Sequence, residues 1–173
     1  MSQAFDVGAY VKYGGTGICR IDRIEELEFP GQRTPRACYV LRPLRNSAIE
    51  VSVPLDNPTL CGKIKSLLSR EEADRLLLAA RSEEPIPWIE DRKQRSQEFR
   101  KLIAGGDTAT LLRLVHSILL HKASCGKRLS TADDNVRRDA ERLLDEEYAY
   151  SMGISAEEAG RYIRSHLNPD SKK

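Results

Sequence analysis

The stretch Val7-Gly-Ala-Tyr-Val-Lys-Tyr-Gly-Gly-Thr-Gly-Ile-Cys-Arg-Ile21 decides the fold of the first part of the chain. Its first half, from Val7 to Tyr13, alternates in the two-residue period of a β-strand. The glycines of Gly14-Gly-Thr-Gly17 then suit a tight turn, because glycine adopts backbone angles that other residues avoid. No lysine follows them and a strand pattern resumes, so a hairpin is favoured over a phosphate-binding loop.

Further short strands follow this hairpin. The segment 18–29 continues the alternation, but its phase slips after Ile21, which predicts a bulge or a strong bend. Apolar or alternating runs recur at 38–41 and 49–53, separated by turn residues. Four or five short antiparallel strands within about 50 residues predict a small, strongly bent sheet or barrel.

The rest of the chain has the signals of helices. Ser69 and Ser155 are each followed three residues later by glutamate, the pattern of a capping box, and Ser130 with Asp133 is a weaker version. Five helices are expected, starting at Ser69, near Trp88, at Asp107 or Thr108, at Ser130 and at Ser155. The second should run from near Trp88 to Ala104 and stop at Gly105-Gly106.

The fold class predicted is therefore α+β, a small β-sheet or barrel followed by a compact helical bundle. We expect one domain over 1–66, a helical domain over 67–168 and a disordered tail over 169–173.

Composition limits the kind of function. The 28 basic and 26 acidic side chains nearly cancel, so the chain alone should hold nucleic acid weakly. Its four cysteines are far apart, and no apolar run could span a bilayer, which indicates a reduced, cytoplasmic protein without membrane contact. No histidine, cysteine or carboxylate set has the spacing of a metal or catalytic site, so neither cofactor nor enzymatic activity is expected.

Trp88, the single tryptophan, is the most informative side chain for function. It follows Pro85 and Pro87 and precedes a basic stretch that includes Arg92, Lys93 and Arg95. A large planar ring beside cations is suited to wedge or stack against opened nucleic acid. A place for Trp88 in the helical core is equally compatible with the pattern, and charged helix positions are more often a solvated face. Lys127 and Arg128, before the helix at Ser130, form a second cationic spot.

The whole chain, from about residue 5 to 165, resembles the CarD/CdnL family of bacterial transcription regulators. The resemblance rests on the order and spacing of short motifs: Val7-Gly8, Val11-x-Tyr13, Gly17, Tyr39-Val40-Leu41, Ile49-x-Val51-x-Val53-Pro54, Asn57, Trp88, Gly106-Asp107, Leu129-Ser130, Ala140-Glu141-x-Leu143-Leu144 and Glu146-x-Tyr148-Ala149.

The resemblance implies a Tudor-like N-terminal domain that docks on the RNA polymerase β subunit, as in transcription-repair coupling factors. It also implies a helical domain that contacts promoter DNA at the upstream edge of the bubble, with Trp88 as the wedge and Arg92, Lys93, Arg95, Lys127 and Arg128 around it. Candidates for the polymerase surface are Arg20, Arg23, Glu50 and Ser52, with the 49–53 strand or the one before it as a docking edge.

Three functions remain open on the sequence. A polymerase-bound, non-enzymatic regulator, expected to be a monomer associated with the nucleoid through polymerase, is favoured. An adaptor of the same fold, with Trp88 buried and no DNA contact, is the alternative. An enzyme would require a concave pocket with convergent polar groups.

Overall fold

The computed structural model describes residues 4–168, and the tail predicted over 169–173 lies outside them. The chain separates into two compact units, one ending at Leu67 and the other beginning at Leu68. We call them the sheet unit and the helical unit. Their succession confirms the predicted α+β class.

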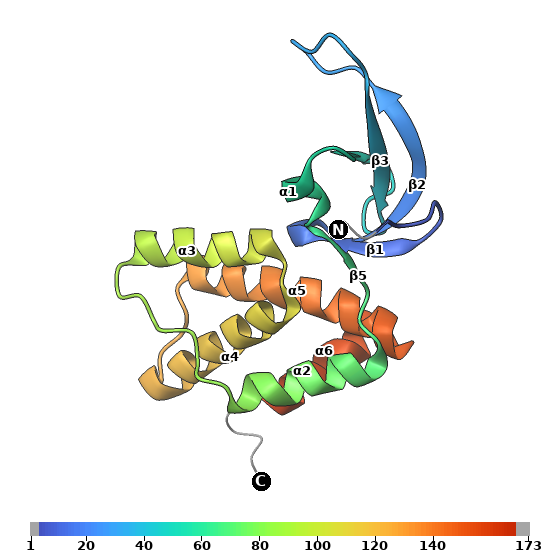
Figure 1. Ribbon diagram of the computed structural model, residues 1–173. Coiled ribbons are helices and arrows are strands. Elements are labelled where there is room, and N and C mark those ends of the chain that lie inside the picture. Colours follow the sequence, from blue (N-terminus) through green and yellow to red (C-terminus); the bar gives the residue numbers. More distant parts are fainter. Residues whose placement is uncertain (1–3, 169–173) are drawn as a thin grey trace. The chain divides into compact units, whose positions relative to one another are not determined.

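The sheet unit is built on five antiparallel strands in the order β4-β3-β2-β1-β5 (Figure 1). The strands are β1 (Tyr10–Tyr13), β2 (Gly17–Leu27), β3 (Arg36–Pro43), β4 (Val51–Pro54) and β5 (Ile64–Ser66). A four-residue helix, α1 (Pro58–Cys61), precedes β5 and is capped by the Asn57 side chain, which accepts from the Leu60 N–H. Strand β5 was not predicted, because three residues are too few to show a period.

The glycine-rich turn between β1 and β2 has the predicted role. Gly14–Thr16 make one 3₁₀ turn, and Gly17, at φ 89°, pairs with Tyr13 to open the hairpin. The sheet register shifts between Ile21 and Arg23, so the bulge predicted from the phase slip is confirmed. A bulge strengthens the local twist of a strand.

One face of the sheet carries the core of this unit. Its buried residues are Val11, Cys19, Ile21, Tyr39, Leu41, Val53 and Ile64, and Leu60 and Cys61 of α1 pack against them. The alternation of the strands places Ile18, Cys38 and Val40 on the opposite face, where they are also buried, together with polar residues such as Arg20 and Arg42.

The helical unit contains the five predicted helices (Figure 1). They are α2 (Arg70–Ser82), α3 (Arg92–Gly105), α4 (Thr108–Cys125), α5 (Thr131–Met152) and α6 (Ala156–Leu167). The capping boxes at Ser69 and Ser155 form as predicted, and Asp107 is the N-cap of α4. These caps satisfy helix N–H groups that have no partner within the helix.

Helix α5 is the centre of the helical unit, since it packs against each of the other four helices. Its apolar stripe includes Val136, Ala140 and Leu144, all fully buried. At its C-terminal end the Tyr148 hydroxyl donates to the Ala73 carbonyl of α2, at 2.6 Å. Burial raises the pKa of this phenol, so it stays protonated as a donor.

The start of α3 differs from the prediction. The helix begins at Arg92, capped by the Asp91 side chain, and does not extend back to Trp88. The Asp91 cap explains the difference, because the backbone of Asp91 is extended and its side chain caps the first helical turn, while the prolines at 85 and 87 keep the residues before them extended. The extended segment is held instead by the Ile86 N–H, which donates to Ser117 Oγ at 2.7 Å.

Asp145 on α5 leads to a prediction about pH. Burial raises its pKa from 3.8 to about 6, with Arg164 opposing the shift and Glu141 adding to it. The pKa of this carboxyl is higher in the folded chain than in the unfolded chain. Folding therefore becomes less favourable as the pH rises from the pKa of the unfolded chain to the pKa of the folded chain. Asp145→Asn should therefore stabilise the chain by about 1–2 kcal/mol near pH 7.5, after a discount for partial solvent screening.

This gain should disappear below about pH 4, where Asp145 is protonated in both states. Thermal melts of the parent chain and the variant across this range measure the difference directly. The exposed Glu157 of α6 provides a control, because Glu157→Gln should change stability little at either pH. A gain from Asp145→Asn that does not depend on pH would contradict the assignment.

Candidate functional sites

Trp88 lies in the extended segment before α3 and is partly buried at the border of the helical core. Its ring stacks on that of His121 from α4, with centroids 3.6 Å apart and planes 7° from parallel. Phe99 of α3 meets it edge-on, at 5.9 Å and 69°. The indole is thus fixed by aromatic neighbours, yet it is not sealed inside the bundle.

Arg95 is not on the surface where the sequence placed it. It is only 5% exposed, and its guanidinium binds both carboxylate oxygens of Asp133, at 2.9 and 2.8 Å. It also donates to the Ile89 carbonyl at 2.7 Å and lies 4.5 Å from the centroid of the Trp88 ring. Arg95 therefore links α3, the start of α5 and the segment that carries the indole.

Asp133 completes this clamp at the N-terminus of α5. Burial alone would raise the pKa of Asp133, but hydrogen bonds from Arg95 and Ser130 lower it below its ordinary value. The Ser130 hydroxyl donates to Asp133 at 2.7 Å and accepts from the Asp133 N–H at 3.1 Å. The weak capping signal in the sequence thus marks a buried charge pair, which the helix pattern alone did not reveal.

An open hollow of about 400 Å³ lies beside the indole, and we call it the Trp88 hollow. Its lining residues are Trp88, Glu90, Arg92, Arg95, His121, Cys125, Lys127, Arg128, Leu129, Ser130 and Asp133. The structure therefore brings Trp88 and four of the five predicted DNA-contact cations to one place. Lys93 is exposed but is not among the lining residues.

The charge of this hollow is not balanced. Arg95 and Asp133 neutralise each other, which leaves Arg92, Lys127 and Arg128 against Glu90 alone. Within residues 4–168, these three cations, which we call the cationic rim, take part in no hydrogen bond or ion pair.

Many basic side chains elsewhere on the helical unit are paired with carboxylates, namely Arg100, Lys101, Arg113, Arg137, Arg138, Arg142 and Arg161. Unpaired cations around an accessible aromatic ring can attract phosphate groups.

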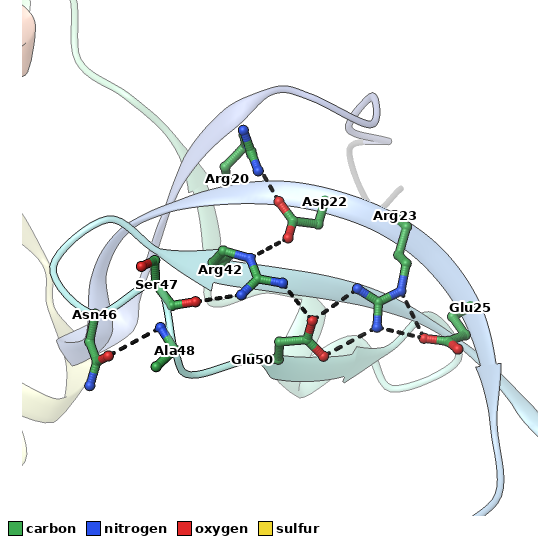
Figure 2. A network of polar contacts seen from close by, with 9 residues as sticks. All are labelled: Arg20, Asp22, Arg23, Glu25, Arg42, Asn46, Ser47, Ala48 and Glu50. Carbon is green, nitrogen blue, oxygen red and sulfur yellow. Dashed lines mark hydrogen bonds and ion pairs between the residues drawn. The ribbon is translucent and has the colours of Figure 1, made fainter.

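A second polar site covers one face of the sheet unit (Figure 2). Six side chains alternate in sign along a continuous chain of contacts: Arg20, Asp22, Arg42, Glu50, Arg23 and Glu25. We call this set the charge ladder. It contains three of the four residues predicted for the polymerase surface, and strands β2 and β3 and the turn before β4 supply its members.

Hydrogen bonds hold the ladder in its charged form. Those from Arg42 and Arg20 keep the pKa of Asp22 below its usual value, and that from Arg23 does the same for Glu50. Arg42 also donates to the Ser47 carbonyl, which ties the ladder to the turn before β4. Because the charges cancel, the ladder presents a patterned surface rather than a field of one sign.

Ser52, the fourth candidate, is exposed on the edge strand β4. The Leu55 N–H donates to the Ala37 carbonyl at 2.9 Å, which marks this opposing pair as hydrogen-bonded. Hydrogen-bonded and non-hydrogen-bonded pairs alternate along antiparallel strands, so the pair of Ser52 and Val40 is not hydrogen-bonded. The backbone N–H and C=O of Ser52 therefore point away from β3 and out of the sheet edge. Pro54 faces the same way, but its carbonyl accepts from Asn57 N–H and Cys61 Sγ.

Four further contributors were missed on the sequence. Asp22, Glu25 and Arg42 belong to the charge ladder. Arg42 lies opposite Arg20 across β2 and β3, so the register could have indicated it, whereas Asp22 lies at the bulge and Glu25 pairs with Arg23 along β2. His121 was set aside because it has no metal-ligand spacing. It is thirty-three positions from Trp88 on another helix, so only the packing of α4 brings the two rings together.

None of the helices in the described part of the chain is long and apolar enough to cross a bilayer. No group of three or more histidine, cysteine or carboxylate side chains between residues 4 and 168 is placed to hold a metal ion.

Comparison with protein families gives a match over the first part of the chain. Residues 5–66 match the family model described as the CarD-like/TRCF RID domain, which covers the sheet unit and not the helical unit. No curated protein matches the chain.

Proposed function

We propose that the chain is a CarD-like protein that interacts with RNA polymerase and regulates promoter opening, because residues 5–66 match the model of the CarD-like/TRCF RID domain. The sheet unit docks on the polymerase β subunit. The helical unit contacts promoter DNA at the upstream edge of the transcription bubble, where Trp88 stabilises the open complex. The proposal needs no catalysis and extends the family relationship to residues 67–168.

The observation that carries the DNA part is the Trp88 hollow. An aromatic ring there is fixed in place but reachable, and the surrounding cationic rim has no carboxylate partner among residues 4–168. Phosphates neutralised by such cations release counterions, which favours binding. The ring can meanwhile stack on or wedge between bases that have separated. Arg92, Lys127 and Arg128 are therefore proposed phosphate contacts, with Lys93 beside them.

Arg95 has a different part in this proposal. A guanidinium that is buried and fully engaged with Asp133 cannot also bind a phosphate. Its bonds to the Ile89 carbonyl and its place over the indole instead hold Trp88 ready to insert. A residue prepared in its bound geometry loses less conformational entropy on binding.

The wedge would act by differential binding. Opened DNA accepts the indole between separated bases, and a closed duplex does not accept it equally well. The equilibrium between closed and open promoter then shifts by no more than the difference in affinity. Docking on polymerase supplies the remaining binding energy, which agrees with the nearly neutral charge of the chain.

Docking can be tested at Ser52. If the outward N–H and C=O of Ser52 pair with a strand of the partner, Ser52→Pro should weaken polymerase binding by tenfold or more, roughly the cost of a lost edge hydrogen bond together with local misfit. Proline is tolerated at a sheet edge, so the unit should remain folded. Binding of the full chain to polymerase by biolayer interferometry measures the effect.

Ser52→Ala is the matched control, because it keeps the backbone N–H and removes only the hydroxyl. It should bind as the parent chain does. Equal weakening by both variants would show that the side chain makes the contact, and no weakening by either would exclude β4 as the docking edge.

DNA contact can be tested on the cationic rim. Lys127→Glu combined with Arg128→Glu should reduce promoter opening by roughly tenfold. The slope of the logarithm of the DNA-binding constant against the logarithm of salt concentration should become shallower by about two, as expected for two lost phosphate contacts. Opening is followed with a fluorescent base placed in the bubble, in the presence of polymerase.

The control makes the same change of charge outside the hollow. Arg142→Glu with Arg161→Glu replaces two exposed cations that already have carboxylate partners. If both double variants have the same effect, general electrostatics accounts for it and the hollow does not contact DNA.

An adaptor that binds polymerase without touching DNA is the second candidate. The packing of Trp88 between Phe99 and His121 favours it, since such contacts also occur in a purely structural ring. Under this alternative, rim variants would leave promoter opening unchanged while Ser52→Pro abolished the effect of the chain on polymerase.

A further inference from the structure

The Trp88 indole does not present both of its faces to solvent. The ring of His121 lies parallel to it, 3.6 Å away and tilted by only 7°. This is the spacing of stacked bases, and the two rings therefore form one two-layered block. Both residues line the Trp88 hollow, so the block borders the surface where the cationic rim lies.

Neighbouring residues of α4 help to hold the His121 imidazole in position. His121 is in the last part of α4, where the Cys125 sulfur, one turn later, lies 3.4 Å from His121 Nε2. The Ser124 hydroxyl donates to the His121 carbonyl at 3.0 Å and secures the end of the helix. The stack thus joins two elements, with the indole on the segment before α3 and the imidazole on α4.

The thickness of the block has a consequence for DNA. The centroids of the two rings are 3.6 Å apart. Adding the van der Waals radius of carbon, about 1.8 Å, on each outer face makes the pair about 7 Å thick. The minor groove of closed B-DNA is only about 6 Å wide, whereas a single ring is about half as thick as the pair. A lone indole would therefore enter closed DNA far more readily than the pair.

We infer that Trp88 and His121 enter DNA together as a two-ring wedge, and that His121 determines the preference for opened over closed DNA. The inference rests on the proposed DNA contact and adds a residue and a physical basis for its selectivity. In closed duplex the pair is too thick for the groove and must remain outside. At a fork, where the strands separate, the gap admits both rings. Arg95 lies over the remaining face of the indole, so the outer face of the His121 imidazole is the one that can stack on a neighbouring base.

The test compares two DNA ligands of identical sequence, a closed duplex and a fork junction with one unpaired end. Fluorescence anisotropy at low salt gives the affinity of the full chain for each, and the ratio of the two is the fork preference. His121→Ala should reduce this preference by about fivefold, equivalent to one base-stacking contact at the low end of the usual range.

His121→Phe keeps a flat ring of similar thickness and should restore most of the preference. His166→Ala is the matched control, because it removes another partly buried histidine beside an aromatic ring, Tyr162, outside the hollow. It should leave the preference unchanged. In a Trp88→Ala background, His121→Ala should have little further effect, since residues of one wedge are not additive.

The outcomes separate this inference from the proposed function. If Trp88→Ala removes the fork preference and His121→Ala does not, the chain uses a single-ring wedge and the role of His121 is overturned. If the parent chain shows no fork preference and Trp88→Ala has no effect on promoter opening, the DNA contact itself fails and the two-ring wedge fails with it. Thermal melts confirm that each variant is folded at the assay temperature.

Discussion

Arg95→Ala is expected to lower the free energy of unfolding of the helical unit by about 3–5 kcal/mol, because it leaves the Asp133 carboxylate buried without its partner. Both members of the pair have side chains only 6% exposed. The Ile89 carbonyl loses its donor in the same change. The melting temperature of the unit should fall by more than about 10 °C, measured by far-UV circular dichroism, which follows helix content.

Removing both partners should cost less than the two single changes together. Arg95→Leu with Asp133→Leu leaves no buried charge, and such replacements are often close to neutral. Arg161→Ala is the surface control, because its pair with Glu157 is longer, at 3.6 Å, and exposed. It should cost less than about 0.5 kcal/mol. A loss below about 1 kcal/mol for Arg95→Ala would contradict the clamp described for Trp88.

Trp88→Ala is expected to shorten the lifetime of the open promoter complex by about tenfold or more, since one ring stacked on a base contributes about 1–3 kcal/mol. Polymerase binding should not change, because the proposed docking surface lies on the sheet unit and not on the helical unit. The lifetime is measured by challenging preformed open complexes with a competitor and following their decay.

Stability must be measured beside this lifetime. The indole is only partly buried, so its loss should cost less than the 3–5 kcal/mol of a fully buried tryptophan. Trp88→Phe, which keeps an aromatic ring, should restore part of the lifetime. A variant that melts below the assay temperature, with its promoter effect restored by lowering the temperature, would favour the adaptor.

Local signals in the sequence were sufficient for most of the elements. Serine and glutamate three residues apart predicted the starts of α2 and α6, and the capping geometry is present at both. Each of these signals depends on a few neighbouring residues, as does the bulge after Ile21. The predicted start of α3 was wrong by one turn. The apolar stripe of this helix can be continued back to Trp88, but the Asp91 side chain caps the helix and makes it begin at Arg92.

The candidate sites depended on contacts that no local pattern contains. Its neighbours in the sequence make Arg95 look like a surface cation. It is buried because Asp133, on α5, provides a buried carboxylate to pair with it. The stacking of His121 and the position of Arg42 also depend on how separate elements pack. Residue types near Trp88 could thus be predicted, but which of them remain available to a partner could not.

The central position of α5 also sets the order in which the protein can fold as it is made. Helices α2, α3 and α4 leave the ribosome before the residues that cover their apolar sides, including the tyrosine that closes on Ala73. The sheet unit has its complete core earlier, by the time β5 has emerged. Nascent chains interrupted after β5 has left the ribosome and before α5 has done so should therefore carry a finished N-terminal module and a protease-sensitive, chaperone-binding remainder.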